Sequence, residues 1–185
     1  MNEQYVKASL KEAQVGLDAL INNEAMIGRI AAAGHLIAQS QMAGGSVFSC
    51  GNGGSLCDAM HFAEEMTGRY RKNRQPFRAV AIADASHMAC VANDFGYLDV
   101  FSRWVEAFGK PTDVLLAIST SGKSANILKA ALNAKEKGMK VIVLTGKDAT
   151  ELTDAADGVQ ELHIKVIHIL IELIERELAP ENYSE

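Results

Sequence analysis

The stretch Ser46-Val47-Phe48-Ser49-Cys50-Gly51-Asn52-Gly53-Gly54-Ser55 decides the fold, because a short apolar run leads directly into a glycine-rich loop. The run covers residues 46–50, and similar runs follow at 79–83, 114–120 and 140–144. None alternates strictly between apolar and polar residues, which is typical of strands buried on both faces. Helices are predicted between the runs at 56–68, 87–108 and 124–138. This alternation predicts an α/β protein, a three-layer αβα sandwich around a parallel, doubly wound, Rossmann-like sheet.

Two N-terminal helices are predicted before the first strand. Residues 3–21 repeat apolar side chains at helical spacing, and a second apolar face runs from Glu24 to Met42. Gly44-Gly45 follows, and a glycine pair of this kind ends helices in a left-handed conformation.

The last predicted helix, at about 159–178, is unusually apolar. Nine of the thirteen residues in 162–174 are aliphatic, and they occur on every side of the helix. A helix that is apolar all round must be buried all round. We therefore expect a buried C-terminal helix that is partly covered by a second subunit; the alternative is a central helix buried within its own monomer.

Composition narrows the class of protein. With 185 residues, 48% hydrophobic and 22% charged, the chain is expected to form a single globular domain over residues 1–185. A net charge of −5 argues against a nucleic-acid partner. Three cysteines without CxxC spacing fit reduced cytosolic thiols. Neither a secretory signal nor an apolar run near the ~18 residues of a membrane span is found, so we expect a cytoplasmic protein with no membrane partner.

The glycine loop, residues 50–55, comes directly before a helix. Its glycines allow a ligand to approach the backbone closely, and the helix N-terminus favours an anion. Leu56 occupies the position where a dinucleotide fingerprint requires a third glycine, and the Gly-Lys-Ser/Thr of a Walker A loop is absent. No nucleotide cofactor is therefore expected. The alternative is a tight turn that binds no ligand.

The hydroxyl loop, residues 119–124, reads Ser119-Thr120-Ser121-Gly122-Lys123-Ser124. Four hydroxyls stand just before a helix, with Ser124 placed to act as its N-cap. Hydroxyls together with unpaired backbone N–H groups suit the three oxygens of a phosphate monoester. The alternative is a plain capping loop, although that would need only one or two of the hydroxyls.

His61 and Glu65 lie four residues apart and therefore share one helix face. This spacing can bring two metal ligands together, or a base and its partner. In the C-terminal helix, Gln160, His163 and His168 are the polar exceptions. Burying His168 costs free energy unless its ring nitrogens are paired, and a backbone carbonyl is the alternative partner.

Other polar residues carry weaker signals. Asn93-Asp94 either caps the next helix or touches a polar ligand, and Asp84 is expected to be a cap. Arg69 follows the helix of His61 and either serves that site or belongs to a solvated loop. Glu64 is expected to be a solvated charge on the helix face.

Several of these motifs together resemble the sedoheptulose-7-phosphate isomerase (phosphoheptose isomerase) family of bacteria. The resemblance covers nearly the whole chain and implies the sugar isomerase (SIS) fold, a five-stranded parallel sheet between helices, assembled as a homotetramer. The motifs that match are Ser49-Cys50-Gly51-Asn52-Gly53-Gly54-Ser55, Cys57–Glu65, Thr67–Arg71, Asn93–Gly96, Ile118–Gly122 and Glu161–His168.

The resemblance implies the conversion of sedoheptulose 7-phosphate, a phosphorylated seven-carbon sugar, to D-glycero-D-manno-heptose 7-phosphate by proton transfer through an enediol(ate). This is the first step towards ADP-heptose for the lipopolysaccharide core. It further implies one zinc ion per subunit, with Glu65 and His168 also acting as catalytic base and acid. The implied zinc ligands are His61, Glu65, Gln160 and His168. The expected substrate-binding residues are Asn52, Gly53, Gly54, Ser55, Glu65, Arg69, Asn93, Asp94, Ser119, Thr120, Ser121, Ser124 and Gln160.

The chain departs from the family near its C-terminus. The family has a fifth strand and a loop with Pro-His and Tyr-Ala-Asp elements at this point, whereas here Asp157-Gly158 runs straight into Val159-Gln160. Either these residues are absent, or the sequence is interrupted there. We favour an interruption, because losing a strand would expose a hydrophobic sheet edge.

A non-catalytic alternative remains within the same fold. SIS relatives include phosphosugar-sensing regulators and a replication-initiator-binding protein, which act by binding partners. A binder could keep the hydroxyl loop but has no need for a base and an acid on separate helices. Because His61, Glu65, Gln160 and His168 are all present, the isomerase is favoured.

Overall fold

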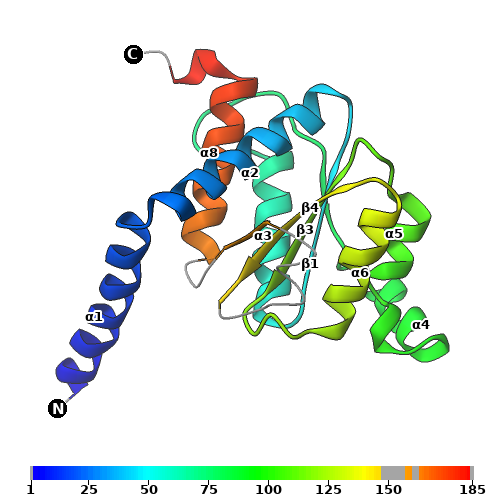
Figure 1. The fold of residues 1–185 in the computed structure, drawn as a ribbon, viewed down its shortest axis with the longest axis horizontal. Coiled ribbons are helices and arrows are strands. Elements are labelled where there is room, and N and C mark those ends of the chain that lie inside the picture. The colour runs from blue at the N-terminus through cyan, green and yellow to red at the C-terminus, as the bar shows by residue number, and fades with distance from the viewer. Residues whose placement is uncertain (1, 147–156, 160–162, 184–185) are drawn as a thin grey trace.

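A single parallel sheet organises the protein (Figure 1). The structure is a computed structural model, and it describes residues 2–146, 157–159 and 163–183. Within these ranges five strands lie in the order β2-β1-β3-β4-β5, and every pairing is parallel. The strands are β1 Val47–Gly51, β2 Ala79–Ala81, β3 Val114–Ser119, β4 Lys140–Thr145 and β5 Asp157–Val159.

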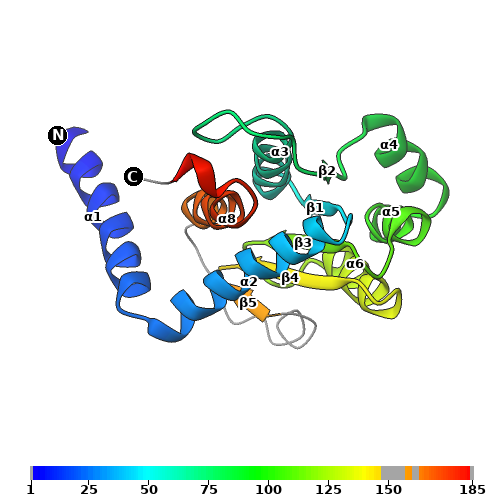
Figure 2. The same ribbon diagram turned by 90° about the horizontal axis from the view of Figure 1, so that it is seen from above.

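Helices cover both faces of this sheet (Figure 2). Helices α2, α3 and α8 pack on one face, and α4, α5 and α6 pack on the other. The predicted three-layer αβα sandwich is therefore confirmed. The helices are α1 Asn2–Ile21, α2 Glu24–Met42, α3 Gly54–Thr67, α4 Ala85–Asp94, α5 Ser102–Phe108, α6 Ala125–Glu136 and α8 His163–Leu178, with 3-10 turns η1 Tyr97–Asp99 and η2 Pro180–Asn182.

Strand β3 shows how the two helical layers share the sheet. Leu116 and Ile118 point into the core cluster that contains α2, α3 and α8. Leu115 and Ala117 point into the cluster that contains α4, α5 and α6. All four side chains are fully buried, because successive residues of a strand face opposite sides of the sheet.

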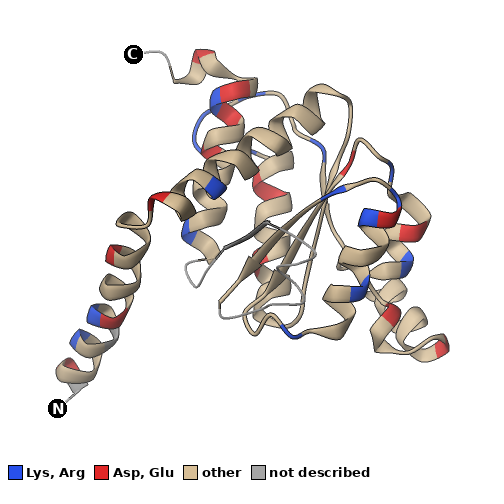
Figure 3. Cartoon of the chain, in the orientation of Figure 1, with Lys and Arg blue, Asp and Glu red and all other residues tan. Residues whose placement is uncertain are grey.

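Helix α1 projects away from the rest of the chain (Figure 1). Its apolar residues largely face solvent: Leu10 is 67% exposed, whereas Leu20, near the junction with α2, is buried. Charged residues are interspersed along the same helix (Figure 3). Within one described chain, the apolar face predicted for residues 3–21 is therefore left uncovered.

The single helix predicted at 87–108 is wrong. The segment forms α4, the turn η1 and α5 instead. Gly96 separates them with φ of +91°, a left-handed conformation that glycine adopts readily and that no helix can continue. Apolar periodicity on either side of this glycine hid the break.

The C-terminal region also differs from expectation. Val159, expected to start the last helix, belongs to β5, which pairs with β4. It supplies the fifth strand that the family resemblance implied and that the apolar runs did not predict. The interruption expected between Gly158 and Val159 is wrong, because β5 runs unbroken through both residues. Helix α8 begins at His163, and Gln160 lies outside the described residues.

Helix α8 is covered mainly by its own chain. Ile167, Leu170 and Ile171 are fully buried in the cluster with α2 and α3, whereas Ile164 is 42% exposed. The buried C-terminal helix is thus confirmed, but a second subunit is not needed to cover most of it.

Among the described residues, no helix has both the length and the apolar composition needed to cross a membrane.

The three free cysteines should differ sharply in reactivity. Cys50 is fully buried in β1, and burial raises its pKa to about 12, while Cys57 and Cys90 are exposed. Because the thiolate is the reactive species, we expect a thiol reagent at pH 8 to label Cys57 and Cys90 quickly and Cys50 only after denaturation. The rate of labelling is measured by the absorbance of the thiolate that the reagent releases when it reacts with a cysteine. A Cys50→Ala variant is the control, and rapid labelling of all three native thiols would contradict the buried position of Cys50.

Candidate active site

At the carboxyl ends of β1 and β3 the connections out of the sheet change face. The chain leaves β1 through α3 on one face and leaves β3 through α6 on the other. Gly51 pairs with Ile118, so the glycine loop and the hydroxyl loop start side by side. In open α/β sheets, ligands bind at such a switch point, beyond the carboxyl ends of the strands.

Two positions of the glycine loop require glycine, for different reasons. A Cβ atom at Gly51 would lie 2.4 Å from the Ser55 carbonyl oxygen. Gly53, at the N-cap of α3, has φ of +55°, a conformation that favours glycine. Among the described residues no side chain caps α3 here, and the backbone N–H groups of Ser55 and Leu56 donate to the Asn52 and Gly53 carbonyl oxygens at 3.0 Å. The positive end of the α3 dipole still favours an anion at this point.

Asn52 is held by residues that the sequence did not single out. Its carboxamide forms a reciprocal pair with the buried Asn126, with both N–O distances 3.0 Å. The Tyr97 hydroxyl donates to Asn52 Oδ1 at 3.0 Å. These contacts join the glycine loop to the first turn of α6 and to η1. The only available sequence signal was that Asn126 lies two residues beyond the hydroxyl loop.

The hydroxyl loop is bonded within itself. Ser119 Oγ donates to Ser124 Oγ at 3.0 Å, and Ser121 Oγ accepts from the Lys123 backbone N–H at 3.2 Å. Ser124 is the N-cap residue of α6, as predicted, but its side chain makes no capping hydrogen bond. Thr120 and Ser121 are exposed. The hydroxyls therefore surround a helix N-terminus without closing it, which suits an oxyanion.

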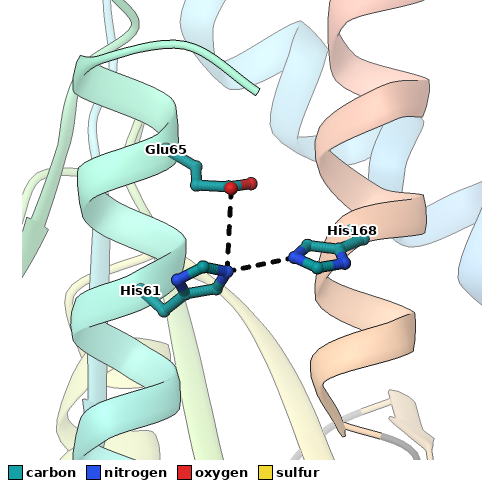
Figure 4. Close-up of side chains that lie close together, drawn as sticks. All are labelled: His61, Glu65 and His168. Atoms are coloured by element: carbon teal, nitrogen blue, oxygen red, sulfur yellow. Dashed lines mark hydrogen bonds and ion pairs between the residues drawn. The ribbon is translucent and has the colours of Figure 1, made fainter. Parts of the chain in front are cut away.

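His61, Glu65 and His168 converge between α3 and α8 (Figure 4). The Nε2 atoms of the two histidines are 3.0 Å apart, and His61 Nε2 lies 3.7 Å from Glu65 Oε1. One donor atom from each of the three residues lies within 4.8 Å of the others. The predicted pairing of His61 with Glu65 on one helix face is confirmed, and His168 joins them from a helix more than a hundred residues further along the chain.

The Glu65 carboxyl group is poorly solvated. Its side chain is 14% exposed, and among the described residues Oε2 is buried without a hydrogen-bond partner. Burial raises the pKa of Glu65, and the nearby His61 and His168 partly offset this rise. This carboxyl group can accept or release a proton more readily near neutral pH than an exposed glutamate.

The donor set of this cluster fits a metal ion. Two imidazoles and one carboxylate form the three-ligand set of many catalytic zinc sites, which leave further positions open. The facing Nε2 atoms need either a shared proton or a cation between them, and the buried Oε2 of Glu65 also lacks a donor. The three residues can therefore hold a divalent cation. The fourth expected ligand, Gln160, lies outside the described residues.

Two neighbours of the cluster were not predicted from the sequence. Glu64 Oε1 lies 3.4 Å from His61 Nδ1, although its side chain is 68% exposed, as expected of a solvated charge. A carboxylate on the second ring nitrogen fixes the orientation and tautomer of a ligating histidine. Tyr70 stacks on the His168 ring with centroids 5.1 Å apart.

The remaining candidates have mixed outcomes. Asn93 and Asp94 end α4 and bond to each other at 2.7 Å, so they do not cap the following helix. Asp84 is the N-cap of α4 and accepts from the His87 backbone N–H, as predicted. Arg69 is exposed just after α3. Whether Asn93, Asp94 and Arg69 bind substrate stays a prediction.

Comparisons with known proteins identify the family. The SIS domain family model matches residues 10–146. A phosphoheptose isomerase of Escherichia fergusonii is 54% identical over 191 aligned positions, covering 97% of this chain and 100% of that protein. The solved phosphoheptose isomerases of Neisseria gonorrhoeae and Francisella tularensis are 34% and 28% identical, each with a TM-score of 0.85, and each comparison covers 95% of this chain and 99% of the other. The chain therefore belongs to the phosphoheptose isomerase family of SIS-domain proteins.

Proposed function

We propose that this isomerase converts sedoheptulose 7-phosphate to D-glycero-D-manno-heptose 7-phosphate, the first step towards ADP-heptose for the lipopolysaccharide core. The observation that carries the proposal is the convergence of His61, Glu65 and His168 from α3 and α8. A regulator that only senses phosphosugars does not need a buried carboxyl group beside two histidines. The 54% identity to a phosphoheptose isomerase over nearly the full chain supports the same choice.

The two ends of the substrate match two parts of the site. The hydroxyl loop and the N-terminus of α6 bind the C7 phosphate through Ser119, Thr120, Ser121 and Ser124, while Asn52 and Gly53–Ser55 contact the sugar. His61 follows Gly54 by seven residues, which is about 10 Å along α3. An extended sugar bound at the loops therefore reaches towards the cluster with its carbonyl end. Arg69, Asn93 and Asp94 complete the substrate contacts.

The chemical step moves a carbon-bound proton from C1 to C2 and a hydroxyl proton from O1 to O2. Glu65 takes the proton from one carbon and returns it to the other, and a well-placed base of this kind contributes roughly 10²–10⁴-fold to the rate. Oε1 of Glu65 faces His61 while Oε2 is unpaired among the described residues, so the two oxygens can serve different partners. Binding the remote phosphate fixes the carbon skeleton against this carboxyl group.

One zinc ion per subunit would be held by His61, Glu65 and His168, with Gln160 as the fourth ligand. When bound, zinc would polarise the substrate oxygens as a Lewis acid. His168 was also predicted to act as the catalytic acid. A ring nitrogen that ligates a metal cannot donate a proton at the same time, so at Nε2 these two roles belong to different states of the site.

The chain works as a homotetramer, forms one SIS domain over residues 1–185 and acts in the cytoplasm. The exposed apolar face of α1 supports the assembly, since Val6, Leu10 and Ile21 are each more than half exposed in one chain. The free thiols of Cys50, Cys57 and Cys90 support the reducing compartment.

Replacing the base should stop proton transfer without stopping binding. We expect Glu65→Gln to lower turnover of sedoheptulose 7-phosphate by about 10²–10⁴-fold, because the amide keeps the shape but cannot take the proton. Exchange of the substrate C1 proton in D₂O, followed by NMR, measures this directly. Glu106→Gln makes the same change on α5 at the opposite face and should leave exchange unchanged. Near-normal exchange in Glu65→Gln would remove Glu65 from the mechanism.

The hydroxyl loop can be tested in the same inactive background. We expect Ser121→Ala, combined with Glu65→Gln, to weaken binding of sedoheptulose 7-phosphate by about 10–150-fold, because one hydrogen bond to a charged group contributes about 1.5–3 kcal/mol. Calorimetric titration measures the affinity, and urea unfolding should stay cooperative. Ser46→Ala, just before β1 at the opposite edge of the sheet, is the control. Unchanged affinity in the Ser121 variant would make the loop purely structural.

The assembly should depend on α1. Wild-type protein should sediment at equilibrium as a species about four times the 19.9 kDa chain mass, and Leu10→Glu should shift it to smaller species because a charge replaces an exposed apolar contact. Ala8→Glu adds the same charge at another exposed position, two residues away and therefore on the opposite side of α1, and should preserve the wild-type mass. A monomeric wild type at micromolar concentration would rule out the tetramer.

A further inference from the structure

A buried ion pair joins α8 to the segment that follows α3. The side chains of Arg74 and Glu175 are both fully buried, and Arg74 Nε donates to Glu175 Oε1 at 2.8 Å. The guanidinium also lies over the Phe77 ring, 4.1 Å from its centroid. The other Glu175 oxygen, Oε2, accepts from the Tyr183 hydroxyl at 2.7 Å, which attaches the C-terminal turn η2 to the pair.

The same guanidinium caps the end of α3. The last carbonyls of a helix have no partner within the helix. Arg74 Nη2 donates to the Glu65 carbonyl oxygen at 2.7 Å, and Nη1 donates to the Met66 carbonyl oxygen at 2.8 Å. Nη1 also contacts the Gly68 and Gln75 carbonyl oxygens at 3.1 and 3.2 Å. One side chain therefore satisfies much of the last turn of α3.

These contacts reach the backbone of the catalytic cluster itself. The Glu65 carbonyl oxygen accepts a hydrogen bond from Arg74, and the Glu65 carboxyl group lies next to His61. Glu175 follows His168 by seven residues, which is two turns of α8 on the same side of the helix. The Arg74–Glu175 pair thus connects the main chain of Glu65 to the helix that holds His168.

Stability alone does not explain this arrangement. A buried ion pair often contributes little net stability compared with apolar residues of the same volume, because both charges must be desolvated. The rigid, planar guanidinium group of Arg74 adds directionality, because its N–H donors fix the positions of both the carboxylate and the carbonyl oxygens to which they bond. The apolar contacts between α3 and α8 lack such direction.

We propose that Arg74, anchored by Glu175 and Tyr183, is a positioning residue that sets Glu65 and His61 on α3 against His168 on α8. The proposal rests on the metal-binding and proton-transfer roles proposed above for these three residues. Arg74 acts through the backbone of α3 and does not touch the reacting atoms. A substitution that removes the planar guanidinium group of Arg74 should therefore disturb the cluster of His61, Glu65 and His168 without disturbing the hydroxyl loop.

Arg74→Lys tests this directly, because lysine keeps the charge and loses the planar fork. The probe is Co²⁺ alone, titrated into the full-length protein and followed by its visible absorption. We expect affinity for Co²⁺ to fall by about 10–100-fold, the usual effect of losing a group that orients metal ligands. We also expect kcat for sedoheptulose 7-phosphate to fall by a similar factor while KM changes by less than about threefold, because the phosphate site is intact.

Val105→Ala is the matched control. Val105 is fully buried on α5, in the cluster on the other face of the sheet, so its truncation lowers the urea midpoint without touching α3 or α8. Co²⁺ affinity and kcat should stay at the wild-type values in this variant. If Arg74→Lys lowers the urea midpoint but changes Co²⁺ affinity and kcat no more than Val105→Ala does, the ion pair is only structural and the proposal is wrong.

Two further outcomes separate this proposal from the proposed function. Wild-type protein that binds Co²⁺ but does not turn over the sugar would overturn the function, while the Co²⁺ shift in Arg74→Lys would still decide the positioning role. Wild-type protein that turns over the sugar without binding Co²⁺ would overturn the proposed metal site, and the ratio of the kcat values of Arg74→Lys and wild type would then decide the positioning role.

A second variant covers the case in which Arg74→Lys does not fold. Tyr183→Phe removes only the hydroxyl bound to Glu175, and it should lower Co²⁺ affinity and kcat by about twofold or more. Unchanged values would overturn the proposal.

Discussion

The packing of α8 against α2 and α3 is the interaction on which the site depends. Ile167, Leu170 and Ile171 are fully buried in that contact, and with them in place His168 faces His61 across the gap between the helices (Figure 4). Apolar burial stabilises this contact but is non-directional. The directed bonds from Arg74 to Glu175 and to the last carbonyls of α3 complement it.

In the proposed function, substrate recognition and proton transfer fall to different parts of the fold. Backbone N–H groups and hydroxyls at the carboxyl edge of the sheet form the part suited to a phosphate, and the Asn52–Asn126 pair joins the glycine loop to the first turn of α6. The titratable groups lie instead on helix faces about two turns away from that edge. A substrate with its phosphate and its carbonyl at opposite ends suits this separation, because each end meets the kind of group that recognises it.

Much of the fold was predictable because it repeats locally. The apolar runs of β1, β3 and β4 and the apolar faces of α2 and α6 are patterns within one element, and the structure bears them out. The errors occurred where one residue or a few short-range contacts override a pattern. Gly96 splits the helix predicted at 87–108. The three residues of β5 are too few to give a strand signal and are strand only because β4 pairs with them.

The sequence by itself determined the αβα class, the glycine and hydroxyl loops, and the shared face of His61 and Glu65, since these depend on residues close together in the chain. Spacing alone could not bring His168 to this pair; the family resemblance implied it, and the tertiary structure confirms it. Only the tertiary structure decided that Asn126 holds Asn52, that Arg74 and Glu175 join α3 to α8, and that α1 rather than α8 leaves its apolar face uncovered. The physical reason is that local periodicity fixes which side of an element is apolar. Which elements meet, and at what register, follows from packing summed over residues far apart in sequence.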